Sequence, residues 1–149
     1  MIGQTIPPRR DKILSKLGEG GMGLVYKAQD LKLDRFEALK FLQPHIAKHG
    51  EERKRFRVEA QAAAGLNHSN IAIIYSIEEF KLASAEEGDE MFIDMEYIKG
   101  KTLKDKIETG PLSIDETLNL AIPMARGLQT AHEEWGRTKR KNWIWSDWI

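Results

Sequence analysis

A cluster of glycines near the start of the chain limits what can follow it more than any other feature. The segment reads G-E-G-G-M-G and places Gly18, Gly20 and Gly23 in G-x-G-x-x-G order. An apolar run precedes the cluster and the Val- and Tyr-containing run L-V-Y-K-A follows it, so we expect the glycines at the tip of a β-hairpin. A dinucleotide-binding fold requires a helix at this point. The pattern therefore favours a hairpin over the phosphates of a nucleotide, with a merely flexible hairpin tip as the alternative.

A second candidate lies on the expected third strand, E-A-L-K-F-L. Side chains alternate along a strand, so Ala38 and Lys40 face the same way, roughly 7 Å apart at ~3.3 Å per residue. The small side chain would admit a flat base while the ammonium group reaches phosphate oxygens. The alternative is an ordinary lysine at the rim of a sheet.

The helix expected over residues 51–66 carries a carboxylate on its apolar side. Phe56, Ala60 and Ala63 have the spacing of one helix face, and Glu59 lies on the same stripe. A lone carboxylate is costly to desolvate there, so Glu59 needs a cationic partner. Lys40, in an apolar strand, is the natural candidate.

The remaining elements place strands before helices. Apolar runs at 71–77 and 91–98 predict two further strands. The segment S-I-D-E, from Ser113 to Glu116, predicts a capping box, and the helical spacing behind it predicts one long amphipathic helix from Ile114. The order of three strands, a helix, two strands and helices indicates an α+β fold.

Composition excludes several classes of protein. The 23 basic and 23 acidic residues give a net charge of +0, which argues against a nucleic-acid binder. The chain has no Cys, so disulfide frameworks, thiolate zinc sites and cysteine nucleophiles are excluded. His45 and His49 lie four residues apart without a third ligand, so we expect no metal site. The start of the chain lacks the order of a signal peptide and no apolar run is long enough to span a membrane, so we expect a cytoplasmic protein.

The last fifteen residues differ in composition from the rest. All four Trp residues fall within residues 135–149, together with four basic residues and one acidic residue. Such a segment would suit a membrane interface, but Trp143, Trp145 and Trp148 share no helical face. We therefore expect a Trp-rich basic tail that is disordered or comes from a reading-frame change in a once longer gene.

Five segments follow one another along residues 11–134. They are L-G-E-G-G-M-G-L-V-Y-K-A, E-A-L-K-F-L, R-F-R-V-E-A-Q-A-A-A-G-L-N-H-S-N-I, M-F-I-D-M-E-Y-I-K-G-K-T-L and A-R-G-L-Q-T-A-H-E. In this order they resemble the N-terminal part of a serine/threonine protein kinase domain of the bacterial type. The resemblance implies an N-terminal lead over residues 1–10 and an ATP-binding small lobe over residues 11–98. In this small lobe a five-stranded antiparallel sheet would carry one packed helix. Residues 99–134 would then form the hinge and the first helices of an incomplete large lobe.

The resemblance also implies roles for individual residues in an ATP site. Lys40 would contact the phosphates and pair with Glu59, as a strand lysine and a helix glutamate do in that family. Met95 would lie at the back of the adenine pocket. The other implied residues enclose the adenine, shape the phosphate lid or supply hinge backbone: Leu17 and Val25 with Ala38; Gly18 and Gly20 with Gly23; and Glu96 to Ile98.

The segment after A-H-E departs from the family pattern. The motifs H-R-D-x-K-x-x-N and D-F-G, which supply the catalytic aspartate and the Mg²⁺ ligands, do not occur in the 149 residues. We therefore expect a chain truncated before the catalytic loop, with no catalytic residue and no metal ligand of its own. Two smaller departures are Glu37, where Val is common, and Ser69, where Pro is common.

Two functions remain open for such a chain. The first is the ATP-binding portion of a kinase that is inactive alone, although its family transfers the γ-phosphate of ATP to Ser or Thr of protein substrates. The second is a non-catalytic interaction module that docks on another protein kinase as a decoy. Neither function involves nucleic acid or a membrane, and the exposed apolar face of the helix from Ile114 favours self-association.

Overall fold

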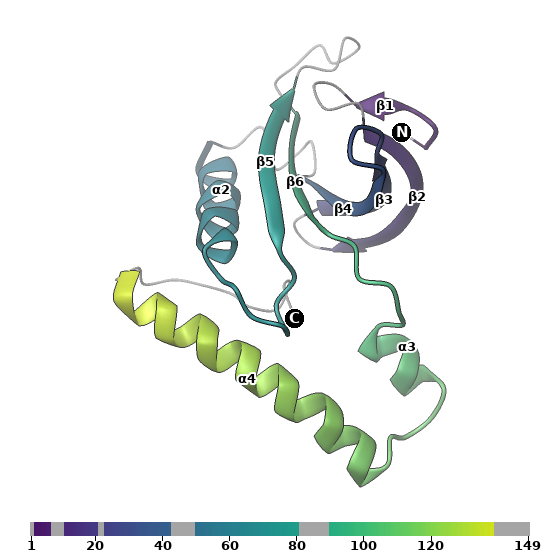
Figure 1. Cartoon of the computed structure of the whole chain (residues 1–149), viewed down its shortest axis with the longest axis vertical. Coiled ribbons are helices and arrows are strands. Elements are labelled where there is room, and N and C mark those ends of the chain that lie inside the picture. Colours follow the sequence, from purple (N-terminus) through teal and green to yellow (C-terminus); the bar gives the residue numbers. More distant parts are fainter. Residues whose placement is uncertain (1, 7–10, 21–22, 43–49, 81–89, 139–149) are drawn as a thin grey trace. The chain divides into compact units, whose positions relative to one another are not determined.

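Six strands form one antiparallel sheet in the computed structural model, which describes residues 2–6, 11–20, 23–42, 50–80 and 90–138 of the chain. They lie in the order β1-β2-β3-β4-β6-β5 (Figure 1). Their bounds are β1 (Thr5–Ile6), β2 (Asp11–Gly20), β3 (Gly23–Asp30), β4 (Arg35–Leu42), β5 (Ile74–Phe80) and β6 (Glu90–Glu96). The five expected strands are present. The N-terminal lead adds the sixth, β1, which pairs with the start of β2.

Aromatic side chains hold the centre of the sheet together. The ring of Phe41 on β4 meets those of Tyr26 and Phe80 edge-on, with centroids 5.7 and 6.4 Å apart. It lies 5.1 Å from the ring of Phe92 on β6. Such pairs contribute about 0.5–1.5 kcal/mol beyond the burial of their surface. Strands β4 and β6 are therefore joined by side-chain packing as well as by backbone hydrogen bonds.

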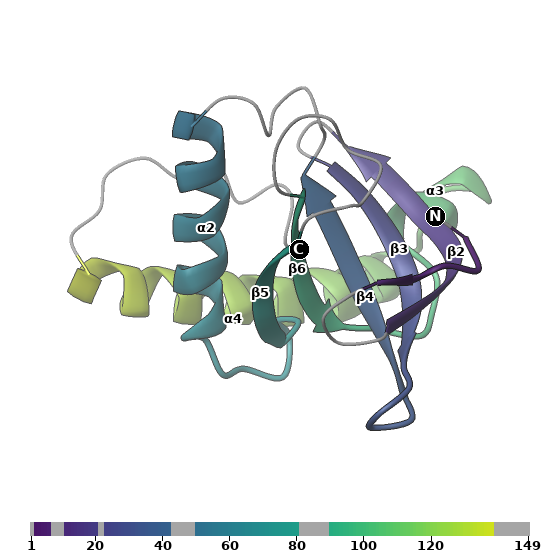
Figure 2. The ribbon, with the colours of Figure 1, turned by 90° about the horizontal axis from the view of Figure 1, so that it is seen from above.

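Helix α2 (Gly50–Ala64) packs beside β5 (Figures 1 and 2). Its buried residues are Phe56, Glu59, Ala60 and Ala63, which confirms both the expected apolar face and the inward carboxylate. Arg57 and Arg53 of the helix both contact the carboxylate of Glu79 on β5, Arg53 at 3.5 Å. These ion pairs tie the helix to the edge strand of the sheet.

The chain divides into two compact units. The first contains Met1–Gly65 and Ile73–Tyr97, and so includes the sheet and α2. The second contains Leu66–Ala72 and the chain from Ile98 onward. Its helices are α3 (Leu103–Glu108) and α4 (Ile114–Thr138). Because α4 continues to Thr138, the change in composition at residue 135 does not coincide with the end of the helix.

Both helices of the second unit begin with a capping box. The Ser113 hydroxyl accepts a hydrogen bond from the Glu116 N–H at 3.2 Å, and the Glu116 carboxylate accepts one from the Ser113 N–H at 3.1 Å. Thr102 and Asp105 repeat this arrangement at α3. Hydrogen bonds to Ser113 lower the pKa of Glu116, and hydrogen bonds to Thr102 lower the pKa of Asp105. The predicted cap at Ser113 is confirmed, and it fixes where α4 starts.

Helix α4 exposes most of its surface. Gly127 is an exception, because a Cβ atom there would lie 3.2 Å from the carbonyl oxygen of Asn70, so the segment at residues 66–72 packs closely against it. By contrast Ile114, Leu118 and Ile122 are 79%, 49% and 47% exposed. Across the described ranges no helix combines the length and the apolar character that crossing a membrane requires.

Candidate nucleotide-binding site

The strand register brings four of the predicted site residues to one face of the sheet. Val25 pairs with Lys40 across β3 and β4, and Ala38 pairs with Met95 across β4 and β6. Directly opposed residues share a face, and so do residues two apart on one strand. Val25, Ala38, Lys40 and Met95 therefore line a common surface. For Ala38 and Lys40 this is the arrangement that the alternation in E-A-L-K-F-L predicted.

Lys40 occupies a central strand rather than a rim. β4 lies between β3 and β6, and the Lys40 residue is only 7% exposed. The alternative of an ordinary lysine at the edge of the sheet is therefore wrong. Ala38, 6% exposed, leaves its part of the surface without a bulky side chain.

A β-bulge sets the direction of Leu17. Lys16 pairs with Tyr26 and Gly18 pairs with Val25, so Leu17 is the extra residue on β2. Its side chain is 46% exposed, although it is a large apolar group beside the paired Val25. The bulge breaks the strict alternation of β2, so the face of the sheet on which the Leu17 side chain lies cannot be predicted by counting residues along the strand.

The three glycines of the cluster differ in their surroundings. At Gly18 and Gly20 a Cβ atom would meet nothing within 4 Å among the described residues. At Gly23 it would overlap the carbonyl oxygen of Phe41 on the neighbouring strand. Gly23 is thus required for the close approach of β3 to β4, whereas the surface at the other two glycines is open to a ligand.

An ion pair lies beside these glycines. Lys16 Nζ donates a hydrogen bond to Glu19 Oε2 at 2.7 Å, and this bond raises the pKa of Lys16. Both side chains are about half exposed, so solvent screens the pair and its contribution to stability is small.

Glu59 lies on α2 with a cation from its own helix. The Arg55 Nε atom donates a hydrogen bond to Glu59 Oε1 at 3.0 Å, one helical turn away. The need of this buried carboxylate for a cation was predicted, but Arg55 was missed. The i, i+4 spacing in R-F-R-V-E could have indicated it. Pairing of Lys40 with Glu59 stays a prediction.

The end of β6 is held by both backbone and side chain of Glu96. Its N–H donates to the Ile73 carbonyl at 2.8 Å, and its Oε2 accepts from the Ile73 N–H at 3.2 Å. The predicted hinge residue Ile98 belongs to the second unit and is 66% exposed. Because the Glu96 N–H already donates to Ile73, the Glu96 backbone could bond a base only by accepting a hydrogen bond at its carbonyl oxygen.

A lysine on the same face of the sheet was not anticipated. Lys27 pairs with Ala38, and its ammonium group lies 4.2 Å from the ring centroid of Phe36 and 4.6 Å from that of Tyr97. Such contacts contribute about 0.5–1 kcal/mol at exposed sites. They connect β3 and β4 to the residue that follows β6.

Three buried carboxylates gather on the opposite face of the sheet. Oxygens of Asp11, Asp30 and Glu37 lie within 4.8 Å of one another. The Arg35 guanidinium lies 4.0 Å from Asp30 and 3.9 Å from Glu37, and so offsets part of their charge. Glu37 precedes Ala38, so it faces away from the surface that carries Lys40. The departure noted at Glu37 thus belongs to this charged cluster. His45 and His49 lie outside the described residues.

Comparison with known proteins shows the family. A profile of the protein kinase domain matches residues 12–135. The serine/threonine-protein kinase PrkC of Bacillus subtilis is 41% identical over 134 residues, which are 89% of this chain and 19% of PrkC. The serine/threonine-protein kinase PknB of Mycobacterium leprae is 35% identical over 133 residues, 87% of this chain and 21% of PknB. The chain thus spans about a fifth of the length of these curated relatives.

Solved structures give the same result for the fold. The crystal structure of the PknI kinase domain of Mycobacterium tuberculosis aligns with a TM-score of 0.69 at 27% sequence identity. The alignment covers 89% of this chain and 51% of that kinase domain. The sheet, α2 and the first helices beyond the hinge are therefore the small lobe and part of the large lobe of a kinase fold. By its sequence over residues 12–135 and by its fold, the chain belongs to the protein kinase domain family.

Proposed function

We propose that the first unit binds ATP on the face of the sheet that carries Lys40. The observation that supports this most directly is the register that assembles Val25, Ala38, Lys40 and Met95 on one surface. The adenine would lie against the apolar members of this surface and Leu17. The base would take its hydrogen bonds from the backbone of residues 96–98.

The phosphates would lie between the glycine hairpin and Lys40. Open space at Gly18 and Gly20 lets a phosphate approach the backbone closely. The Lys40 ammonium group supplies the positive charge, and Glu59 orients it. Phosphate binding is therefore assigned to one charged side chain and the hairpin backbone.

Protein kinases use Mg²⁺ together with ATP. The residues present do not fit a magnesium site beside Lys40. The cluster of three carboxylates lies on the opposite face of the sheet, and the Glu59 carboxylate is bonded to Arg55. We therefore assign no step to a metal held by the described residues.

The chain is expected to bind ATP weakly, and Lys40→Ala is expected to reduce the affinity roughly ten-fold or more, as for a lost charge-assisted hydrogen bond. Affinity is weak because the D-F-G and catalytic-loop groups that would complete the site are absent from these residues. Isothermal titration calorimetry measures both proteins, with Lys12→Ala, an exposed lysine of β2, as the matched control. Tight binding that depends on magnesium would contradict the proposal.

Within a longer kinase, we propose that the same site presents the γ-phosphate of ATP to Ser or Thr of a protein substrate. The relatives PrkC and PknB carry the name of that activity. For the 149 residues alone we propose nucleotide binding without transfer, because the sequence carries no H-R-D or D-F-G. The cytoplasmic location expected from the sequence remains a prediction.

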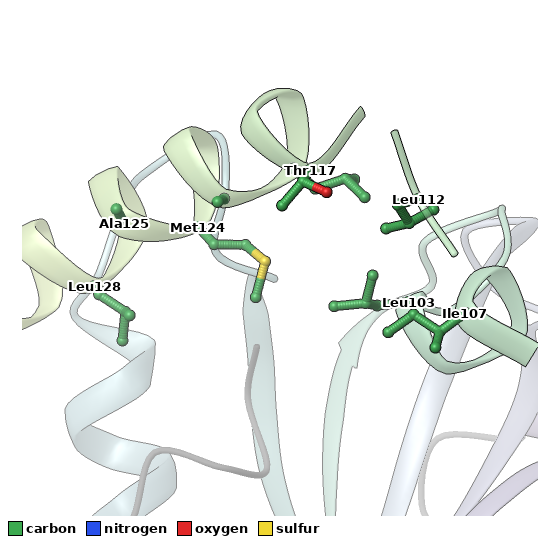
Figure 3. Close-up of a pocket in the computed structure, with 9 residues that line it drawn as sticks. Leu103, Ile107, Leu112, Thr117, Met124, Ala125 and Leu128 are labelled. Atoms are coloured by element: carbon green, nitrogen blue, oxygen red, sulfur yellow. The ribbon is translucent and has the colours of Figure 1, made fainter. Parts of the chain in front are cut away.

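A second candidate function, self-association, is favoured by an apolar groove within the second unit. Its volume is about 540 Å³, and Figure 3 shows side chains of α3 and α4 facing it, among them Leu103, Ile107 and Met124. Thr117 supplies the polar atom among its lining residues. Contiguous exposed apolar surfaces often mark sites of protein association. In a purified sample the molecule available to cover the groove is a second copy of the chain, which presents the same groove.

Replacing Leu103 and Met124 together with Gln is expected to weaken self-association of the purified chain. Both side chains line the groove and are exposed, so their loss removes apolar surface without leaving a cavity. Sedimentation velocity over a concentration series measures the change, with Asn119→Ala as the control on the same helix. A wild-type chain that stays monomeric at high concentration would rule self-association out. A saturable complex with a full-length kinase relative would instead select the decoy function.

A further inference from the structure

Glu59 receives a hydrogen bond from the helix that carries it. Glu59 is 2% exposed, and Arg55 Nε donates to its Oε1 atom at 3.0 Å. The Arg55 side chain is 43% exposed. The guanidinium group therefore reaches from the solvent to a carboxylate in the interior of the first unit.

This bond differs from an ordinary ion pair on a helix surface. Exposed pairs four residues apart contribute only about 0.2–0.5 kcal/mol to helix stability. Here one partner is buried, where an unsatisfied carboxylate is costly and its orientation matters for whatever else it contacts. The neighbouring arginines, Arg53 and Arg57, extend instead to Glu79 on β5. Arg55, by contrast, contacts the carboxylate that is expected to pair with Lys40.

The geometry of the carboxylate allows two cations to share it. A carboxylate has two acceptor oxygens, and the bond from Arg55 uses Oε1. The guanidinium is planar and its N–H is directional, so the bond restricts rotation of the carboxylate. We propose that Arg55 is a positioning residue, which holds Glu59 in the orientation in which it pairs with Lys40. This inference rests on the proposed ATP site and names the residue that sets its phosphate contact.

Arg55→Gln tests the inference through the phosphate-dependent part of binding. Affinity for ATP is expected to fall roughly three- to ten-fold, as for loss of a partly exposed charge-assisted hydrogen bond. Affinity for adenosine should not change, because adenosine has no phosphate for Lys40 to contact. Arg55→Lys keeps a cation at this position and should restore most of the ATP affinity. Arg57→Gln removes the same charge from the same helix and should leave the ratio of ATP to adenosine affinity unchanged.

A second measurement tests the pairing of Glu59 with Lys40 in the absence of nucleotide. The chain is pulsed with acetic anhydride under native conditions, and acylation of Lys40 is quantified by peptide mass spectrometry. The Lys40 amine should be acylated several-fold faster in Arg55→Gln than in the wild type or Arg57→Gln, because Glu59 then pairs with it less well. Melting temperatures establish that all variants are folded.

The two measurements distinguish a failure of the proposed ATP site from a failure of the role proposed for Arg55. If the wild type binds neither ATP nor adenosine, the proposed ATP site is wrong, and the acylation rate still decides the role of Arg55. An unchanged Lys40 acylation rate in folded Arg55→Gln overturns the inference. So does an ATP affinity that stays the same or rises, since a rise would mean that Arg55 competes with Lys40 for Glu59.

Discussion

No phosphate should reach an acceptor protein when the 149-residue chain is incubated with labelled ATP and magnesium or manganese. A general base contributes roughly 10²–10⁴-fold to such a reaction, and the aspartate that would serve is absent with the whole H-R-D motif. Phosphoryl transfer depends almost wholly on positioning and charge neutralisation. The one inward carboxylate assigned to the ATP site, Glu59, is already bonded to Arg55.

The measurement is incorporation of label into a generic acceptor protein, with Lys40→Ala assayed in parallel. Label above background that disappears in Lys40→Ala would contradict the expected inactivity. It would place a catalytic group among the residues after Glu134, because that is where the sequence departs from the kinase pattern.

Two alanine substitutions in the glycine hairpin should affect different properties, one the stability of the first unit and the other its affinity for ATP. Gly23→Ala is expected to lower the free energy of unfolding of the first unit by about 3 kcal/mol or more. Its Cβ would overlap the Phe41 carbonyl, which is backbone of the paired strand and cannot rotate away. Gly20→Ala should change that free energy by less than about 0.5 kcal/mol, since open space surrounds the site. It should weaken ATP binding instead.

Urea denaturation followed by circular dichroism gives the two stabilities, and calorimetry gives the ATP affinities. Each variant is the control for the other, because both add one methyl group to the same hairpin. Equal stabilities would mean that β3 and β4 are not held as closely at Gly23 as the register implies. An unchanged ATP affinity in Gly20→Ala would remove the hairpin from the proposed site.

Strand periodicity predicted part of the surface that carries the candidate site. The spacing of Ala38 and Lys40 predicted that they share a face, and the register confirms it with Val25 and Met95 added from the neighbouring strands. The helix face with Glu59 also followed from spacing, because four inward residues of α2 recur at helical intervals. These two features could thus be predicted from the periodicity of strands and helices and from the cost of burying a charge.

Features that break the period could not be predicted in the same way. The bulge at Leu17 depends on pairing with β3, which residue counting along β2 does not contain. Strand β1 is two residues long, too short for any pattern, and it exists because the chain pairs back onto Lys12. The bond between Arg55 and Glu59 was not predicted, because burial of a carboxylate indicates that it needs a cation but not which cation supplies it.

The segment Leu66–Ala72 has a consequence for how this chain can be divided. The polypeptide leaves the first unit after Gly65, returns at Ile73 and leaves again after Tyr97. A fragment that stops at Tyr97 is therefore not an isolated copy of the first unit, because it keeps seven residues whose neighbour Gly127 has been removed. The units are defined by contacts between residues, and no single cut in the sequence separates them. A gene for the first unit alone would need both a short linker in place of residues 66–72 and a stop codon after Tyr97.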